Sequence, residues 1–212
     1  MARLQRLGPR TVPVLARGQR YIFAQSIEDV AEFVGLERTA AARLPPDVLI
    51  ARWRTILALA VRYARQFPDA RLDEHVLPTR PRPVRELAHH VFRVAEAFLE
   101  TAEGGAEYSV RAANEPPRAA LPRAADIAAF GEGVAARVEA WWAGRGVRDC
   151  AAMVPTYYGP QSLHQLLERS TWHCAQHVRQ LADVLTRFGI APEAVLGAAD
   201  LDGLPMPEAL WA

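Results

Sequence analysis

The stretch Leu166–Leu181 reads LLERSTWHCAQHVRQL and carries the helical pattern on which the predicted fold depends. Its apolar residues recur at helical spacing, and the pattern extends in both directions to predict one long helix over residues 161–188. His173 and His177 are four residues apart, so they stack on one side of this helix. At about 100° per residue they fall about 80° and 40° from the centre of the apolar stripe, beside the buried face.

Three more amphipathic helices precede this segment, each bounded by prolines or glycines. They are predicted at about residues 48–67, 83–102 and 126–143, with a proline-rich linker at 78–83, a loop at 106–122 and a short helix near 192–196. Apolar residues make up 50% of the chain, enough to build a substantial core. Four long amphipathic helices with substantial loops predict a mainly α-helical protein built on a four-helix bundle.

The first 36 residues differ in character from the rest. Val12–Leu15 and Tyr21–Phe23 are rich in β-forming residues and are joined across a glycine, which predicts a β-hairpin. Ser26 then resembles a helix N-cap and Gly35 a C-cap, which predicts a short helix between them. We therefore expect two domains, over residues 1–38 and 45–212.

The two adjacent histidines of the second long helix have different predicted environments. When Leu87 in the apolar stripe is set to zero, His90 falls at about −60° and His89 at about 200°. His90 is therefore expected to face the core, and His89 is expected to face solvent.

His90, His173 and His177 are thus expected on or beside the buried faces of two helices. A single core histidine is usually hydrogen-bonded to the backbone, and that alternative stays open for each of them. Three buried imidazoles without partners are costly, and one metal ion would satisfy all three. A cysteine follows His173 where a zinc protease of the His-Glu-x-x-His type needs glutamate, which argues against a protease.

The composition excludes several kinds of chemistry. All 25 basic residues are arginine, so no lysine is present for a Schiff base or a nucleotide-binding P-loop. The net charge of +1 gives no field that favours nucleic acid. The abundance of alanine and arginine is typical of a GC-rich bacterial genome.

The cellular setting is inferred from the cysteines and the apolar runs. Two cysteines, Cys150 and Cys174, make no disulfide framework and suit a reducing cytoplasm. We find neither a signal peptide nor a run of about 18 apolar residues, so no membrane span is expected.

Two helical motifs carry a resemblance to a known family. Val84–Phe92 reads VRELAHHVF, and together with Leu166–Leu181 it resembles the DinB/YfiT-like superfamily of metal-binding four-helix bundles. The closing Leu201–Pro207, LDGLPMP, is similar to tails in that family. The resemblance covers about residues 45–212. It implies a divalent metal, zinc or nickel, held by the residues at matching positions: His90, His173 and His177.

A second resemblance concerns the first segment. Thr11–Val14 and Ser26–Val30 resemble the C-terminal half of a glutaredoxin, a fold that binds glutathione beside a cis-proline. The half that would carry Cys-x-x-Cys is missing, because no cysteine precedes Cys150. Redox activity is therefore not expected, and the segment is either a structural remnant or part of a shortened form of a longer protein, which we favour.

The DinB/YfiT-like resemblance implies a thiol-dependent transferase or isomerase. We expect transfer of a glutathione-type thiol to a small electrophile, or hydrolysis, by a homodimer. The alternative is a non-catalytic metal-binding or dimerising module, with a sensor or structural role. Nearby residues add candidates: Glu86 as a ring-orienting or solvated carboxylate, Tyr157 and Tyr158 at the pocket mouth, Gln161 at the helix start, and Cys174 as core packing.

Overall fold

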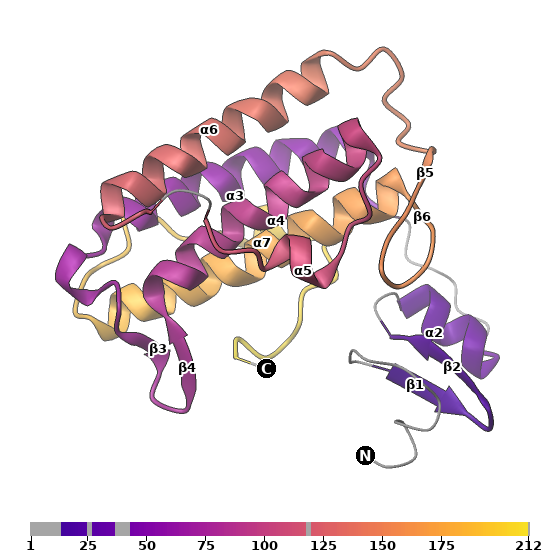
Figure 1. The fold of residues 1–212 in the computed structure, drawn as a ribbon, viewed down its shortest axis with the longest axis horizontal. Helices are drawn as coiled ribbons and strands as arrows, with labels where there is room; N and C mark the ends of the chain where they lie inside the picture. The colour runs from indigo at the N-terminus through magenta and orange to yellow at the C-terminus, as the bar shows by residue number, and fades with distance from the viewer. Residues whose placement is uncertain (1–13, 25–26, 37–42, 118–119, 212) are drawn as a thin grey trace. The chain divides into compact units, whose positions relative to one another are not determined.

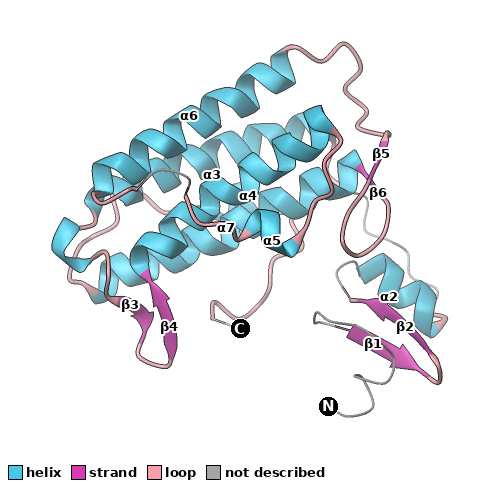
Figure 2. Cartoon of the chain, viewed as in Figure 1, coloured by secondary structure: helices cyan, strands magenta, loops and turns pink. Residues whose placement is uncertain are grey.

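A computed structural model of the 212-residue chain describes residues 14–24, 27–36, 43–117 and 120–211. The chain divides into two compact units, residues 1–42 and residues 43–212. Helices dominate the described residues, and the strands form two-stranded antiparallel hairpins (Figure 2). The mainly α-helical fold class with an N-terminal hairpin, predicted from the sequence, is confirmed.

Four long helices make up the second unit (Figure 1). They are α3 (Pro46–Gln66), α4 (Val84–Gly104), α6 (Ala124–Ala143) and α7 (Leu163–Arg187). Their ends lie within two residues of the predicted ones, because prolines and glycines mark most of the boundaries.

The helices pack in a ring in which α3 and α4 each contact both α6 and α7. Along the shared face of α4 and α6, the ring of His89 stacks on Phe130, and further on the ring of Phe98 meets Trp141. Residue numbers therefore rise in the same direction along both helices, so α4 and α6 are parallel neighbours. The chain has to return along the bundle between them.

Residues 105–123 make this return, and we call them the crossover. The sequence predicts a loop here, which is wrong at α5 (Val110–Ala113), a single helical turn. The turn forms because the Ser109 hydroxyl accepts a hydrogen bond from the Ala112 amide at 3.0 Å. Gly105, with φ of 68°, ends α4 and lets the chain turn back.

Interlocking aromatic side chains fill the core between the helices. Phe98 meets Trp53 and Trp141 edge to face, at centroid distances of 5.1 and 5.0 Å. Phe92 lies against Gly131, where any Cβ would collide with its ring. Cys174 is fully buried, as predicted, and its thiol donates to the Val91 carbonyl at 3.3 Å.

Two small hairpins stand where irregular connections were expected. The linker predicted at 78–83 instead contains β4 (Arg80–Pro83), which pairs with β3 (His75–Leu77) after a single 3₁₀ turn at Asp69–Arg71. β5 (Met153–Val154) pairs with β6 (Gln161–Ser162) just before α7. Gln161 therefore lies in a strand rather than opening the helix.

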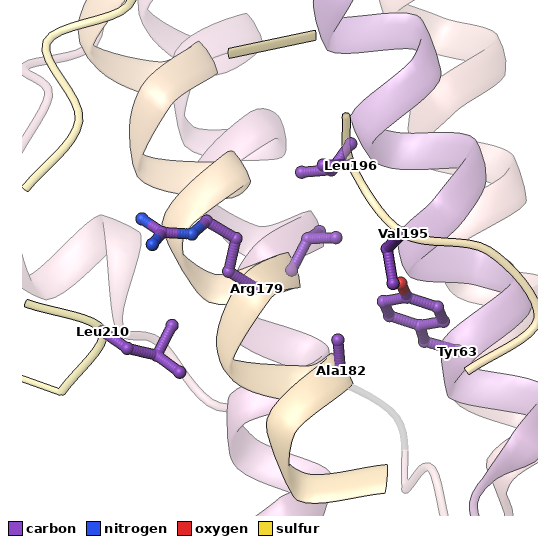
Figure 3. Close-up of a pocket in the computed structure, with 7 residues that line it drawn as sticks. Tyr63, Arg179, Ala182, Val195, Leu196 and Leu210 are labelled. Carbon is purple, nitrogen blue, oxygen red and sulfur yellow. The ribbon is translucent and has the colours of Figure 1, made fainter. Parts of the chain in front are cut away.

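The C-terminal tail, residues 202–211, lies along α7 after a short helix α8 (Ala198–Leu201). The helix predicted at 192–196 is absent, and α8 forms further along the chain. A cavity of about 200 Å³ lies between α3, α7, the connection that precedes α8 and Leu210 of the tail (Figure 3). Its walls are mostly aliphatic, and the Tyr63 hydroxyl at its edge already donates to the Ala194 carbonyl. The lining residues are Tyr63, Val178, Arg179, Ala182, Val195, Leu196 and Leu210.

The first unit contains the predicted hairpin and helix within its described residues. β1 (Val14–Arg17) pairs with β2 (Arg20–Phe23) across a two-residue turn. Gly18 is the first residue of this turn and has a φ of 66°. α2 (Ile27–Val34) follows and ends at Gly35. The Thr11–Pro13 part of the glutaredoxin-like motif and the proposed N-cap, Ser26, lie outside the described residues.

Candidate metal centre

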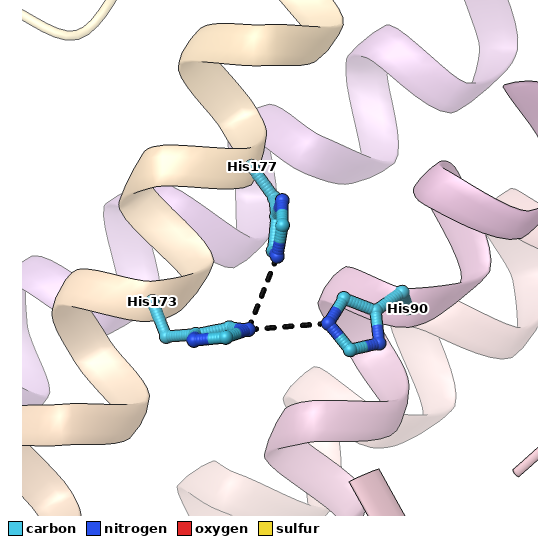
Figure 4. A group of neighbouring side chains, drawn as sticks. All are labelled: His90, His173 and His177. Carbon is cyan, nitrogen blue, oxygen red and sulfur yellow. Dashed lines mark hydrogen bonds between the residues drawn. The ribbon is translucent and has the colours of Figure 1, made fainter. Parts of the chain in front are cut away.

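The three histidines singled out from the sequence come together in the bundle (Figure 4). α4 carries His90, and α7 carries His173 and His177 on successive turns. The Nε2 atom of His173 lies 3.1 Å from Nε2 of His90 and 3.1 Å from Nε2 of His177. One nitrogen from each ring lies within 4.8 Å of the others, so the group could hold a metal ion.

The protons of three neutral imidazoles cannot satisfy both of these contacts. Nδ1 of His177 donates to Gln180 Oε1 at 2.7 Å, so its Nε2 carries a lone pair when the ring is neutral. If His173 Nε2 carries a proton, that proton makes one good hydrogen bond and leaves the other contact unmatched. If it carries a lone pair, that lone pair faces the one on His177. A cation between the three nitrogens would satisfy all of them.

The spacing is close to that of a tetrahedral metal site. Metal–nitrogen bonds of 2.0–2.1 Å at tetrahedral angles place the nitrogens about 3.3 Å apart. The two distances of 3.1 Å at His173 Nε2 are near this value. The ligand nitrogens of His90 and His177 lie no more than 4.8 Å apart, because all three ligand atoms fall within that distance of one another. Rotation of the side chains can bring these two nitrogens as close as a metal ion requires.

Gln180 fixes which nitrogen of His177 faces the group. Its amide nitrogen donates to the Leu210 carbonyl at 2.8 Å, which turns its amide oxygen toward His177 Nδ1. A hydrogen bond of this kind orients a ligand ring and holds the tautomer that leaves Nε2 free to bind metal. Gln180 was not among the residues predicted from the sequence, although its position three residues after His177 on the same helix places it within reach.

The tail is held against α7 by side chains of that helix. Gln176 Nε2 donates to the carbonyls of Ala209 and Leu210, at 3.1 and 2.7 Å. Trp211 Nε1 donates to the Asp183 carboxylate at 2.9 Å. The Leu210 carbonyl that orients Gln180 is therefore fixed from several sides.

Burial keeps the buried rings of the group neutral. It holds the pKa of His90 and the pKa of His173 well below the usual range, and the neighbouring His177 adds to both effects. The Ala113 carbonyl of the crossover acts in the opposite direction on the His90 pKa. Nδ1 of His90 has no hydrogen-bond partner among the described residues, so the Ala113 carbonyl does not reach hydrogen-bond geometry with it. Neutral rings keep the lone pairs that a metal ion needs.

His89 does not face solvent, and this sequence prediction is wrong. Its side chain is only 6% exposed, because its ring stacks on Phe130 of α6 at a centroid distance of 5.1 Å. Burial lowers its pKa to about 4, with Arg93 adding to the effect, so the ring is neutral at neutral pH. Its Nε2 atom is buried and has no hydrogen-bond partner among the described residues.

A cavity of about 850 Å³ lies beside His89 and His90, beneath the crossover. We call it the crossover cavity. Its volume is in the usual range of small-molecule sites, roughly 300–1,000 Å³. Residues from β4, α4, the crossover and α6 line it: Pro81, Arg82, Arg85, Glu86, His89, His90, Asn114, Glu115, Pro116, Pro117, Ala120, Leu121, Pro122 and Ile127.

No family model matches this chain, and no curated protein sequence matches it. The resemblance to the DinB/YfiT-like superfamily therefore stays a prediction. No helix in the described part of the chain is long and apolar enough to cross a membrane.

The other residues proposed from the sequence lie around the centre in different roles. Glu86 is exposed at the edge of the crossover cavity, as expected for a solvated carboxylate. Tyr157 and Tyr158 are not in the wall of that cavity and instead lie against Arg169. The guanidinium of Arg169 sits 5.2 Å from the Tyr158 ring centroid, and its Nη2 lies 3.5 Å from the Tyr157 hydroxyl. Arg169 precedes His173 by one turn and helps to lower the His173 pKa.

Proposed function

We propose that His90, His173 and His177 bind one divalent metal ion and that the bundle is an enzyme that depends on it. The observation that supports this most directly is the convergence of three Nε2 atoms that protons alone cannot pair. The depressed pKa values of His90 and His173 and the Gln180 hydrogen bond are consistent with ligands prepared for a metal.

Zinc or nickel suits this set of donors. The group consists of three imidazoles, without thiolate or carboxylate, and imidazole nitrogen favours zinc, copper, iron and nickel. Three protein ligands leave a coordination position open, as in catalytic rather than structural zinc sites.

The proposed reaction is transfer of a glutathione-type thiol to a small electrophile. An ion in such a site lowers the pKa of a bound thiol or water, which makes thiol transfer or hydrolysis feasible at neutral pH. The resemblance of the helical motifs to thiol-dependent transferases supports the choice of thiol. The crossover cavity beside His90 supports it too, because a two-substrate reaction needs space next to the ligands. We further propose that the protein acts as a cytoplasmic homodimer, which light scattering would test.

Two measurements test the proposal. Elemental analysis of the purified protein is expected to find about one metal ion per chain, and the variant His173→Ala should retain much less. The metal-loaded protein should then conjugate glutathione to members of a panel of small electrophiles faster than the variant His90→Ala. An unmutated protein without bound metal would contradict the proposal as a whole. Bound metal without turnover by any thiol or water would instead favour the non-catalytic sensor or structural module.

A further inference from the structure

The crossover cavity has features of a binding site that the three metal-site histidines do not explain. Only His90 of that group lines it, and the cavity extends away from the group beneath the crossover and β4. The adjacent His89 also lines it, on the preceding position of α4. The chemistry of the cavity therefore depends on what its own walls offer.

His89 supplies the polar atom of the cavity wall that most needs a partner. Its ring is held between α4 and α6 by stacking on Phe130, with an interplanar angle of 28°. The side chain is more than nine-tenths buried, yet its Nε2 has no hydrogen-bond partner among the described residues. A buried polar group left unpaired is destabilising, so such atoms usually mark a ligand or a bound water.

Several of the charged groups in the wall already have partners. Arg85 donates to the Asp73 carboxylate at 2.6 Å and to the Leu121 carbonyl at 2.9 Å. Glu115 lies 3.5 Å from the buried guanidinium of Arg93. The rest of the wall is largely apolar, and prolines form much of it: Pro81, Pro116, Pro117, Ala120, Leu121, Pro122 and Ile127. Such a wall favours a ligand that is mainly apolar.

The field around His89 favours an electron-rich atom on the ligand. Arg82 and Arg85 line the same cavity as His89 and place positive charge in its wall. With its proton on Nε2, the imidazole ring can donate one N–H to a ligand in the cavity. A hydrogen-bond acceptor on the ligand would satisfy this donor and sit favourably near the two arginines.

We propose that the crossover cavity binds a small, mainly apolar organic molecule that carries a carbonyl-type oxygen, and that His89 Nε2 donates a hydrogen bond to that oxygen. The proposal rests on the proposed function only for the role of this molecule, which would be the electrophile. Binding itself needs the cavity and His89, and it does not need the metal.

Two probes of nearly the same shape test the hydrogen bond. Acetophenone carries a carbonyl on an aromatic ring, and ethylbenzene has no acceptor. In ligand-detected NMR titrations the unmutated protein should bind acetophenone more tightly than ethylbenzene by about fivefold, the usual net effect of one hydrogen bond. His89→Phe keeps a ring that can stack on Phe130 but has no N–H, so it should lose the preference for acetophenone.

Two further variants complete the test. His89→Gln retains a side-chain N–H and should keep part of the preference for acetophenone. His75→Gln changes an exposed histidine outside the wall of this cavity and should leave the preference intact. The proposal is overturned if acetophenone shows no saturable binding, or if folded His89→Phe protein keeps the full preference.

The same titration in His173→Ala protein separates this inference from the proposed function. The preference for acetophenone should persist there, because His173 does not line the cavity. If the preference persists while the metal-loaded protein conjugates no thiol, the binding site stands and the transferase proposal fails. Loss of the preference in folded His173→Ala protein would contradict binding that is independent of the metal.

Discussion

Replacing Gln180 with leucine removes the hydrogen bond that orients His177 and leaves the three metal-site histidines themselves unchanged. Two contacts are lost: the 2.7 Å bond to His177 Nδ1 and the 2.8 Å bond to the Leu210 carbonyl. Without the Gln180 acceptor, the proton of His177 is no longer held on Nδ1 and can move to Nε2, where it competes directly with a metal ion.

The expected result is a weaker affinity for metal. Loss of the outer partner of a ligating histidine typically reduces metal affinity by about 10–100-fold. At about 1.4 kcal/mol for each tenfold change, this corresponds to about 1.4–2.8 kcal/mol of binding free energy. The assay is a competition titration of zinc against a chromophoric chelator of known affinity, at fixed pH and ionic strength.

Gln176→Leu provides a matched control on the same helix. Gln176 also donates to the Leu210 carbonyl, and to Ala209 as well, but its amide oxygen accepts a hydrogen bond from Arg179 rather than from a histidine ring. If loosening of the tail were the cause, Gln176→Leu would weaken zinc binding as much as Gln180→Leu. Equal losses in the two folded variants, or no loss in Gln180→Leu, would refute our account of Gln180.

Three further predictions concern stability. Gly131→Ala should lower the free energy of unfolding by about 1–3 kcal/mol in urea titrations, because the added Cβ collides with the core. Gly133 has open space around it, so Gly133→Ala should instead raise the free energy of unfolding by about 0.5–1 kcal/mol. Arg93→Met should destabilise by about 1.5–3 kcal/mol, because partly exposed carboxylates lose their charge-assisted hydrogen bonds to a buried guanidinium; unchanged stability would show that water replaces these bonds fully. Zinc at about 1,000 times its dissociation constant should stabilise the protein by about 4 kcal/mol in thermal melts, and His173→Ala should abolish this increase.

The helices and the three histidines could be predicted because each depends on local periodicity. Apolar residues at helical spacing define the buried stripe of α4 and of α7, and the angle of each histidine from that stripe follows from the geometry of the helix. Prolines and glycines mark most of the ends. About 20 consecutive residues are enough to predict a helix and its buried face, so the rest of the chain is not needed for this step.

The predicted exposure of His89 is wrong because its angle from the apolar stripe indicates exposure only for a helix with one buried face. α4 is buried around most of its circumference, since α6 and the crossover cover the side opposite its apolar stripe. The residues that cover His89, such as Phe130, come from segments more than 20 positions away in the sequence. The role of Gln180 could not be predicted for the same reason, because it depends on Leu210 in the distant tail.

The parallel arrangement of α4 and α6 has a consequence for how this protein could acquire new ligands. Two parallel neighbours have to be joined by a long return segment, and here that segment, residues 105–123, also forms a wall of the crossover cavity. Lengthening such a segment costs little, about 0.6 kcal/mol for each doubling of its length. The shape of the cavity can therefore diverge through insertions and substitutions in the crossover while the helices that carry the histidines stay the same. Selectivity and structural integrity are thus encoded in largely separate parts of the chain.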